Sequence, residues 1–210
     1  MSTIKCSITG ASPLLMNRFT ENAAAKASAG TSSAIRSDGK GLPREQAEPK
    51  LYTMGDSRPM IPGPNIYRGI IDAGVFHKAG KKQITTAKSS LVPAGVLLEE
   101  LEVPVENPFG TEVAWEVDSR SVVNPATGGR MMCHRPRFDA WRLSFTLLVD
   151  DKMFSHELVR VLVDDLGSKI GLGDFRPARK GPFGRFLVSN WQVIPDAKPD
   201  SKSESRKKAA

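Results

Sequence analysis

The chain has 210 residues, of which 40% are hydrophobic and 7% aromatic, and its formal net charge is +7. Two cysteines, Cys6 and Cys133, make no CxxC pair, and no apolar run approaches membrane-spanning length. A disulfide scaffold and a membrane protein are therefore excluded, and a cytoplasmic location is expected. Residues 196–210 contribute +2 and the body retains +5, so nucleic acid or another polyanion is the expected partner, with a charge that serves only solubility as the alternative.

The chain begins with a strand and then changes character. Residues 3–10 alternate between apolar side chains (Ile4, Cys6, Ile8) and polar ones, which predicts a half-buried strand. Residues from about 18 to 50 are small, polar and charged. We expect them to form a mobile insertion with at most short helical pieces, because this composition cannot bury enough apolar surface.

A helix is expected after the insertion. Residues 51–54 predict a short strand, and the prolines of 58–64 predict a rigid turn. Pro64 suits the first position of a helix, where its missing N–H has no cost. Apolar residues at spacings of three and four continue this helix to Ala79, and Gly80-Lys-Lys82 ends it.

The next part of the chain alternates between strands and a turn. Residues 112–123 predict a strand, 124–129 a turn and 130–137 a basic returning strand, so that about 118–140 form a hairpin arm. Residues 141–149 show the clearest alternation of apolar and polar side chains in the chain.

The C-terminal part predicts one helix and one strand. Ser155 is a suitable N-cap for a helix that extends through Leu166 and ends at Gly167 or Gly171. After a glycine-rich segment, residues 186–191 predict the last strand. Residues 196–210 lack large apolar side chains and are expected to form a disordered basic tail.

The order of these elements indicates the fold class. Strand, helix, strand, strand, helix, strand is typical of an α+β sandwich of the ferredoxin-like or RRM-like type. We expect residues 1–195 to form a single domain of this type, with a long early insertion, a hairpin arm and a C-terminal glycine-rich loop.

The segment Gly171–Phe186, called the glycine-rich loop below, is the strongest candidate for a binding element. It contains four glycines, two prolines and four cations in sixteen residues. Glycine lets another molecule approach the main chain, and free N–H groups beside cations form a phosphate cradle. A surface turn with solvated charges is the alternative. The loop residues predicted to bind are Gly171, Gly173, Phe175, Arg176, Arg179, Lys180, Gly184 and Arg185.

Two further basic groups accompany this loop. Single-stranded nucleic acid needs cations for its phosphates and flat or apolar side chains for its bases. For Met131 and Met132, insertion between bases and simple seating of the arm on a neighbouring surface both remain open. The early-helix group is Arg68, Lys78, Lys81 and Lys82, and the arm group is Arg120, Arg130, Met131, Met132, Arg135 and Arg137.

The sequence lacks common catalytic and cofactor patterns. The three histidines are scattered, no nucleotide-binding fingerprint is present, and neither a metal site nor a cofactor is predicted. A metal-dependent endoribonuclease that uses Asp38 or Asp56 is a further alternative, which lacks a second acid at a suitable spacing.

Two segments together carry a family resemblance. Met60-Ile-Pro-Gly-Pro-Asn-Ile-Tyr-Arg-Gly69 resembles the "IPGSSLKG" segment that leads into the first helix of the CRISPR-associated RAMP proteins. The glycine-rich loop, followed by a strand, resembles the C-terminal glycine-rich loop of that family. Pro64-Asn65 stands where the family has a small hydroxyl pair, and Arg68 stands where lysine is common.

The resemblance implies an RRM-like backbone subunit that multimerises along a single-stranded guide RNA in an antiviral effector complex. The early helix, with Asn65, Tyr67 and Arg68, and the glycine-rich loop would face the RNA, and the arm would act as a thumb between bases. The implied partners are guide RNA, target RNA or DNA, other copies of the chain and other effector subunits. The resemblance does not imply that this chain cleaves target RNA as some family members do, because its early loop is elongated and no Asp in it is assigned to the family's catalytic position. A phage or plasmid single-stranded DNA-binding protein of the same fold is the main alternative.

Overall fold

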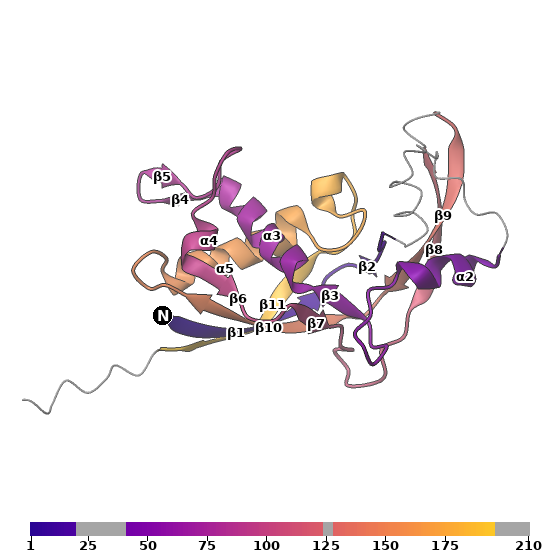
Figure 1. Ribbon diagram of the computed structural model, residues 1–210, viewed down its shortest axis with the longest axis horizontal. Helices are drawn as coiled ribbons and strands as arrows, with labels where there is room; N and C mark the ends of the chain where they lie inside the picture. Colours follow the sequence, from indigo (N-terminus) through magenta and orange to yellow (C-terminus); the bar gives the residue numbers. More distant parts are fainter. Residues whose placement is uncertain (20–40, 124–127, 196–210) are drawn as a thin grey trace, which may run out of the picture.

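The computed structural model describes residues 1–19, 41–123 and 128–195, and within them a four-stranded antiparallel sheet forms the base of the fold. Its strands are β1 (Ser2–Gly10), β6 (Val96–Leu98), β10 (Arg142–Val149) and β11 (Phe186–Ile194), in the order β11-β1-β10-β6. Two helices, α3 (Gly63–Ala73) and α5 (His156–Asp165), cover one face (Figure 1). In this order the fourth strand of the β-α-β-β-α-β motif flanks the first, which confirms the ferredoxin-like α+β fold.

The core lies between this sheet and the two helices. The alternation predicted in the first strand is present, because Ile4, Cys6 and Ile8 are buried. Opposite them, α3 and α5 contribute Ile66, Ile70 and other apolar residues at helical spacing. The predicted N-cap is also present: the Leu158 amide donates to Ser155 Oγ at 3.2 Å.

The opposite face of the sheet carries polar side chains together with the exposed aliphatic residues Leu97, Leu187 and Ile194. Lys5, Ser7 and Thr9 of β1 point away from the helices, and the hydroxyls on this face bond to one another, as Ser7 Oγ does with Ser144 Oγ at 3.1 Å. Thr9 Oγ1 likewise donates to Ser189 Oγ at 3.0 Å. In the described strands no aromatic side chain lies on this face, since the β1–β11 register places Trp191 opposite buried Cys6.

The helix predicted to run to Ala79 is shorter in the structure. α3 ends at Ala73 and is followed by one 3₁₀ turn, η2 (Gly74–Phe76), and a small hairpin of β4 (Lys78–Ala79) and β5 (Lys82–Gln83). The prediction was wrong here because Gly74 packs closely on the next segment: a Cβ at Gly74 would lie 2.4 Å from Thr85 Oγ1. The short helix α4 (Val92–Gly95) then leads into β6.

The rigid turn predicted before α3 is partly a strand. β3 (Met60–Pro62) pairs with β7 (Glu102–Pro104). The short strand predicted at 51–54 reduces to one isolated bridge between Thr53 and Pro59.

The hairpin arm consists of β8 (Glu116–Val123) and β9 (Arg130–Phe138), and it projects from the sheet and helix layers (Figure 1). The short strand β2 (Leu14–Leu15) pairs with its base. Residues 112–123 had been predicted as the second strand of the six-element order. That assignment was wrong, because the sheet position is filled by β6, while β8 belongs to the arm.

The end of the predicted insertion packs against the arm. Helix α2 (Pro43–Ala47) and the 3₁₀ turn η1 (Glu48–Lys50) lie beside β9, with Ala47 fully buried and Lys50 Nζ donating to the His134 carbonyl at 2.7 Å. The rest of the insertion, with Asp38, and the predicted tail lie outside the described residues.

Candidate nucleic-acid interface

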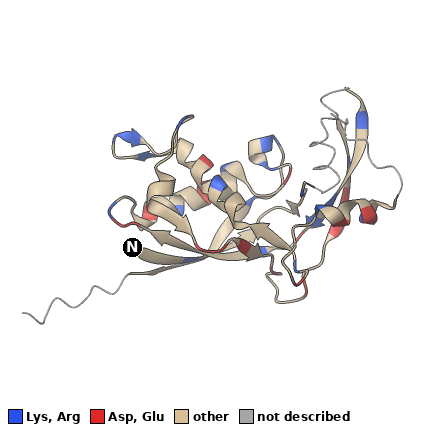
Figure 2. Cartoon of the chain, in the orientation of Figure 1, with Lys and Arg blue, Asp and Glu red and all other residues tan. Residues whose placement is uncertain are grey.

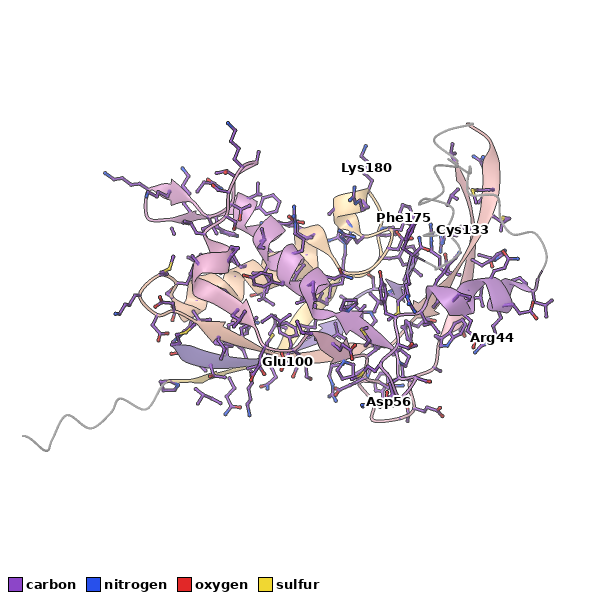
Figure 3. All side chains as sticks on the ribbon, in the orientation of Figure 1. Arg44, Asp56, Glu100, Cys133, Phe175 and Lys180 are labelled. Atoms are coloured by element: carbon purple, nitrogen blue, oxygen red, sulfur yellow. The ribbon has the colours of Figure 1, made fainter. Side chains whose placement is uncertain are left out.

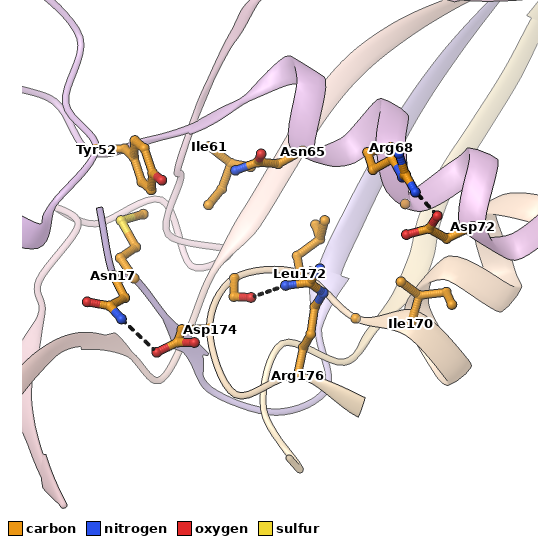
Figure 4. A pocket seen from close by; sticks show the side chains of 14 residues that line it. Asn17, Tyr52, Ile61, Asn65, Arg68, Asp72, Ile170, Leu172, Asp174 and Arg176 are labelled. Carbon is orange, nitrogen blue, oxygen red and sulfur yellow. Dashed lines mark hydrogen bonds and ion pairs between the residues drawn. The ribbon is translucent and has the colours of Figure 1, made fainter. Parts of the chain in front are cut away.

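A cavity of about 270 Å³, lined by both polar and apolar residues, lies where α3 meets the glycine-rich loop (Figure 4). The two segments of the sequence resemblance therefore converge on one site, although more than 100 residues separate them in the chain. The polar side chains that line the cavity are Asn17, Tyr52, Asn65, Arg68, Asp72, Asp174 and Arg176.

Local sequence explains how α3 reaches this cavity. Prolines before and within its first turn set the start of the helix. Gly63 has no tolerance for a side chain, since a Cβ would lie 2.1 Å from the Glu100 carbonyl oxygen. Asn65 and Arg68 are exposed on the cavity side, and Arg68 Nε bonds Asp72 Oδ1 at 2.9 Å.

Tyr67 does not reach the cavity. Its hydroxyl donates to the Val96 carbonyl at 2.9 Å, its ring packs against the core, and burial raises the pKa of its hydroxyl. Tyr67 therefore attaches α3 to β6, and the prediction that it contacts nucleic acid has no support in this geometry.

The glycines of the loop serve its own packing more than an external ligand. Gly171, Gly173 and Gly184 have positive φ angles, a region that favours glycine. A Cβ on Gly184 would lie 1.8 Å from the Leu172 carbonyl oxygen, and one on Gly173 would lie 2.3 Å from that of Leu15. These glycines let the loop fold tightly on itself and on β2.

The predicted cradle of free N–H groups is correspondingly smaller. Most loop amides already donate within the protein, as Leu172 N does to the Gly184 carbonyl at 2.9 Å and Gly184 N to that of Pro13 at 2.8 Å. Among the described residues, the amides of Gly173, Phe175, Arg176 and Ala178 have no such partner. Two of these residues, Gly173 and Arg176, line the cavity.

The four loop cations fall into two pairs. Arg176 donates to the Gly173 carbonyl at 3.0 Å, and Arg185 donates to the Ser168 carbonyl, so both help to hold the loop. The side chains of Arg179 and Lys180 are exposed and make no ion pair or hydrogen bond with any described residue. Figure 3 shows Lys180 and Phe175 near the tip of the loop.

The arginines at the base of the arm bind carboxylates of the protein itself. Arg135 Nε lies 2.8 Å from Asp174 Oδ2 in the glycine-rich loop, and its side chain is only 10% exposed. Arg120 bonds buried Asp118 at 2.8 Å and stacks over the Phe183 ring at 4.9 Å. These contacts join the arm to the loop, a role that the sequence did not reveal.

The remaining arm residues divide by position. Arg137 pairs with Glu116 at 3.0 Å and Asp139 at 2.9 Å and stays close to the base. Toward the tip, Arg130 and Met132 are exposed, whereas Met131 is half-buried. Of the predicted arm residues that the structure describes, Arg130 and Met132 near the tip are exposed, and their side chains make no hydrogen bond or ion pair with other described residues.

The lysines of the early-helix group lie outside the cavity. Lys78, Lys81 and Lys82 are exposed on the β4–β5 hairpin, beyond the C-terminal end of α3. They lie on the same side of the molecule as the glycine-rich loop, where further Lys and Arg residues are visible (Figure 2).

Sequence reasoning missed Asn17, Tyr52, Asp72 and Asp174 as cavity residues. Asn17 Nδ2 donates to Asp174 Oδ2 at 3.2 Å. Asp174 lies within the predicted loop and could have been included, because its neighbours were. Tyr52 carries no local signal, since only the tertiary fold brings it to this position.

Acidic residues give little support to metal chemistry in the described part of the chain. Asp56 pairs with Arg58 at 2.6 Å, and hydrogen bonds from Arg58 lower the pKa of its carboxyl. It lies on the opposite side of the molecule from Lys180 (Figure 3). No group of three or more His, Cys, Asp or Glu side chains within residues 1–19, 41–123 and 128–195 is placed to hold a metal ion. No helix in these ranges is long and apolar enough to cross a membrane.

Comparison with known proteins finds solved structures of similar fold. No protein-family model and no curated protein sequence matches the chain. The fold is similar to that of a chain in the cryo-EM structure of the Type III-B Cmr-beta bound to cognate target RNA, with a TM-score of 0.54 and 11% sequence identity. The match covers 92% of this chain, which spans only 61% of the length of that chain. At this identity the likeness establishes the shared fold.

Proposed function

We propose that this chain is a non-catalytic, RNA-binding subunit of a CRISPR effector complex, of the RAMP backbone type, and that its copies lie along a single-stranded guide RNA. The observation that carries the proposal is the convergence of Met60–Gly69 and the glycine-rich loop on one cavity. The similar fold of a chain in an RNA-bound Cmr structure supports it.

The distribution of side chains favours the helix and loop side as the RNA-binding surface. Many RRM proteins stack bases on aromatic residues of the open sheet face. Here the described strands present hydroxyls there, and these hydroxyls are paired with one another. Unpaired cations and an exposed aromatic, Arg179, Lys180 and Phe175, lie on the glycine-rich loop instead.

The cavity also carries groups that favour RNA over DNA. Asp72 and Asp174 line it beside Arg68 and Arg176. A carboxylate repels a phosphate, but it accepts a hydrogen bond from a ribose 2′-hydroxyl, which DNA lacks. This arrangement suits a sugar or a base edge inside the cavity, with phosphates held by the exposed cations outside.

The proposal includes partners and a place in the cell. The exposed tip of the arm, with Arg130 and Met132, is available to enter between bases, and neighbouring copies and other effector subunits would continue the array in the cytoplasm. We propose no cleavage of target RNA, since Asp56 is held by Arg58 and lies away from the cavity.

Binding to matched oligonucleotides tests the proposal. Fluorescence anisotropy with an unstructured single-stranded RNA, across a salt series, should show tight binding that weakens steeply with salt because counterions are released. DNA of the same sequence should bind more weakly. Absence of RNA binding at low salt contradicts the proposal, and preference for DNA favours the single-stranded DNA-binding alternative. Shortened RNA after incubation with Mg²⁺, lost with chelator, would contradict the non-catalytic role.

A further inference from the structure

The aromatic residue Phe76 lies at the end of α3 with 51% of its surface exposed. The helix predicted to run to Ala79 would include this position. In the structure the inner position is taken by Ile84 and Thr85, which pack against Gly74. The backbone is fixed there, because Thr85 N donates to the Gly74 carbonyl at 3.2 Å and Ile84 N to that of His77 at 3.0 Å. Phe76 is therefore held in solvent by the fold.

Phe76 follows α3 at the end of the helix that leads away from the cavity. Asn65, Arg68 and Asp72 follow one another at spacings of three and four residues, which places them along one side of α3, and Phe76 ends the 3₁₀ turn η2 that continues the chain from this helix. The first three line the cavity. Phe76 lies four residues beyond Asp72, about 6 Å along a helix. A stacked strand covers that length with about two nucleotides.

The surroundings of Phe76 are strongly cationic. Between Asp72 and Glu99 the sequence contains four lysines and no acidic residue. Three of them, Lys78, Lys81 and Lys82, are exposed on the adjoining β4–β5 hairpin. Lys169 Nζ lies over the Phe76 ring, 4.7 Å from its centroid, and its charge is paired with Asp165, so the free positive charge comes from the hairpin lysines. Figure 2 shows basic residues on this hairpin, on α3 and on the glycine-rich loop.

A single exposed apolar residue is common on protein surfaces. An exposed aromatic ring beside unpaired cations has the composition of a site that stacks a base while binding the adjoining phosphates. We propose that Phe76 is a base-stacking platform for the single-stranded RNA as it leaves the cavity, with Lys78, Lys81 and Lys82 binding its phosphates. This inference rests on the proposed function and adds a second contact site to it.

Replacement of Phe76 and of its neighbour Val75 tests the platform in the full chain. Val75 is also 51% exposed, so V75A is a matched control that removes apolar surface without removing a ring. Loss of one stacked base should make F76A bind single-stranded RNA between about five-fold and 150-fold more weakly. V75A should stay within about two-fold of wild type, as exposed substitutions usually do.

A tryptophan at this position gives a direct signal. F76W should retain RNA affinity, and its fluorescence, measured as the difference from wild type with its three tryptophans, should be quenched by RNA. Wild-type and F76A affinities that are equal would overturn the platform while leaving the proposed function intact. Failure of wild type to bind RNA would remove both. Quenching of F76W by poly-L-glutamate but not by RNA would show a surface for an acidic protein and would also overturn the proposal.

Discussion

The arginine and lysine side chains of this chain divide into those that carboxylates or carbonyls already hold and those that solvent alone surrounds. Arg135 is nearly buried against Asp174, whose carboxylate neutralises its charge within the protein. Arg179 and Lys180 have no partner among the described residues. An exposed cation without a protein partner breaks no ion pair when it binds a phosphate. Arg179 and Lys180 should therefore contribute most to RNA affinity.

Removal of the two unpaired loop cations should therefore weaken RNA binding without affecting the fold. Each lost phosphate contact should reduce the slope of log affinity against log salt by about 0.7 for a single strand. The double variant R179A/K180A should show this reduction by anisotropy and unfold at the wild-type urea concentration. The matched control is K5A/K152A, which makes the same change in net charge at two other exposed positions. Equal loss in both variants would show that net charge, not the loop, determines affinity.

The pairing of Arg68 with Asp72 leads to the prediction that a substitution raises RNA affinity instead of lowering it. Arg68 is 72% exposed, and its guanidinium bonds a carboxylate that competes with phosphate. An exposed pair of this kind contributes roughly 0.2–1 kcal/mol, so D72N should raise RNA affinity by up to about five-fold. Because Asp72 also accepts a 2′-hydroxyl in the proposed arrangement, DNA affinity should rise more than RNA affinity, so the preference for RNA over DNA should fall, which parallel titrations would measure.

Asp164 supplies the control for this substitution. It forms the same type of pair with Arg160, four residues apart on α5, and is not among the cavity residues. D164N changes the net charge equally and should leave both affinities near those of wild type. An equal rise in D164N would assign the effect to charge alone.

At the scale of elements, the hairpin arm and the glycine-rich loop behave as one unit. Arg135 of β9 contacts Asp174 of the loop, and Arg120 of β8 contacts Phe183 of the loop. Asp118 bonds Arg120 and lies opposite Arg135 in the β8–β9 register. The arm therefore takes its direction from the loop. A ligand that orders the loop should also order the base of the arm, since the two share these contacts.

Substitution of Arg135 should loosen this unit. R135A leaves Asp174 with only Asn17 as a side-chain partner among the described residues and should cost about 1–3 kcal/mol of unfolding free energy in urea. R137A, whose carboxylate partners are exposed, should cost less than about 1 kcal/mol. Limited proteolysis should cut the arm of R135A first. Equal stability of R135A and wild type would contradict the anchoring role.

The elements that the sequence predicted well are those in which local pattern and tertiary packing agree. Residues 141–149 alternate and form β10, and Ser155 caps α5 as expected. β6 was missed because three residues after a Pro-Gly segment show no alternation that a pattern can detect. Residues 116–123 form a strand as expected, but this strand lies in the arm and not in the sheet, because local pattern does not distinguish a hairpin strand from a sheet strand.

The candidate site was predictable as two segments and not as a set of contacts. The composition of the glycine-rich loop identified it as a candidate. The hydrogen-bond acceptors of its amides could not be predicted, because they include the carbonyls of Leu15 and Pro13 near the N-terminus. Likewise a run of arginines in the arm predicts charge, whereas the carboxylates that hold them come from other elements. Pairing between distant residues decides which cations stay free.

At the scale of the whole molecule, the helix and loop side carries exposed Phe76, Phe175, Arg179, Lys180 and the lysines of the β4–β5 hairpin, whereas the open face of the sheet carries paired hydroxyls and no aromatic side chain of the described strands. This asymmetry favours one continuous track for RNA, from the glycine-rich loop along α3 to the β4–β5 hairpin. A track of this kind contacts a short stretch of RNA per copy and leaves the remainder for further copies.

The number of bound copies should therefore rise in steps as the RNA is lengthened. Native mass spectrometry with single-stranded RNAs of increasing length should find complexes that gain one copy of the chain for each fixed increment. A duplex of the same length and charge is the control, because its bases are already stacked inside the helix and cannot reach Phe76 or Phe175. It should bind weakly and without steps. One bound copy at every length, with normal RNA affinity, would contradict the backbone array and leave a subunit that binds RNA singly.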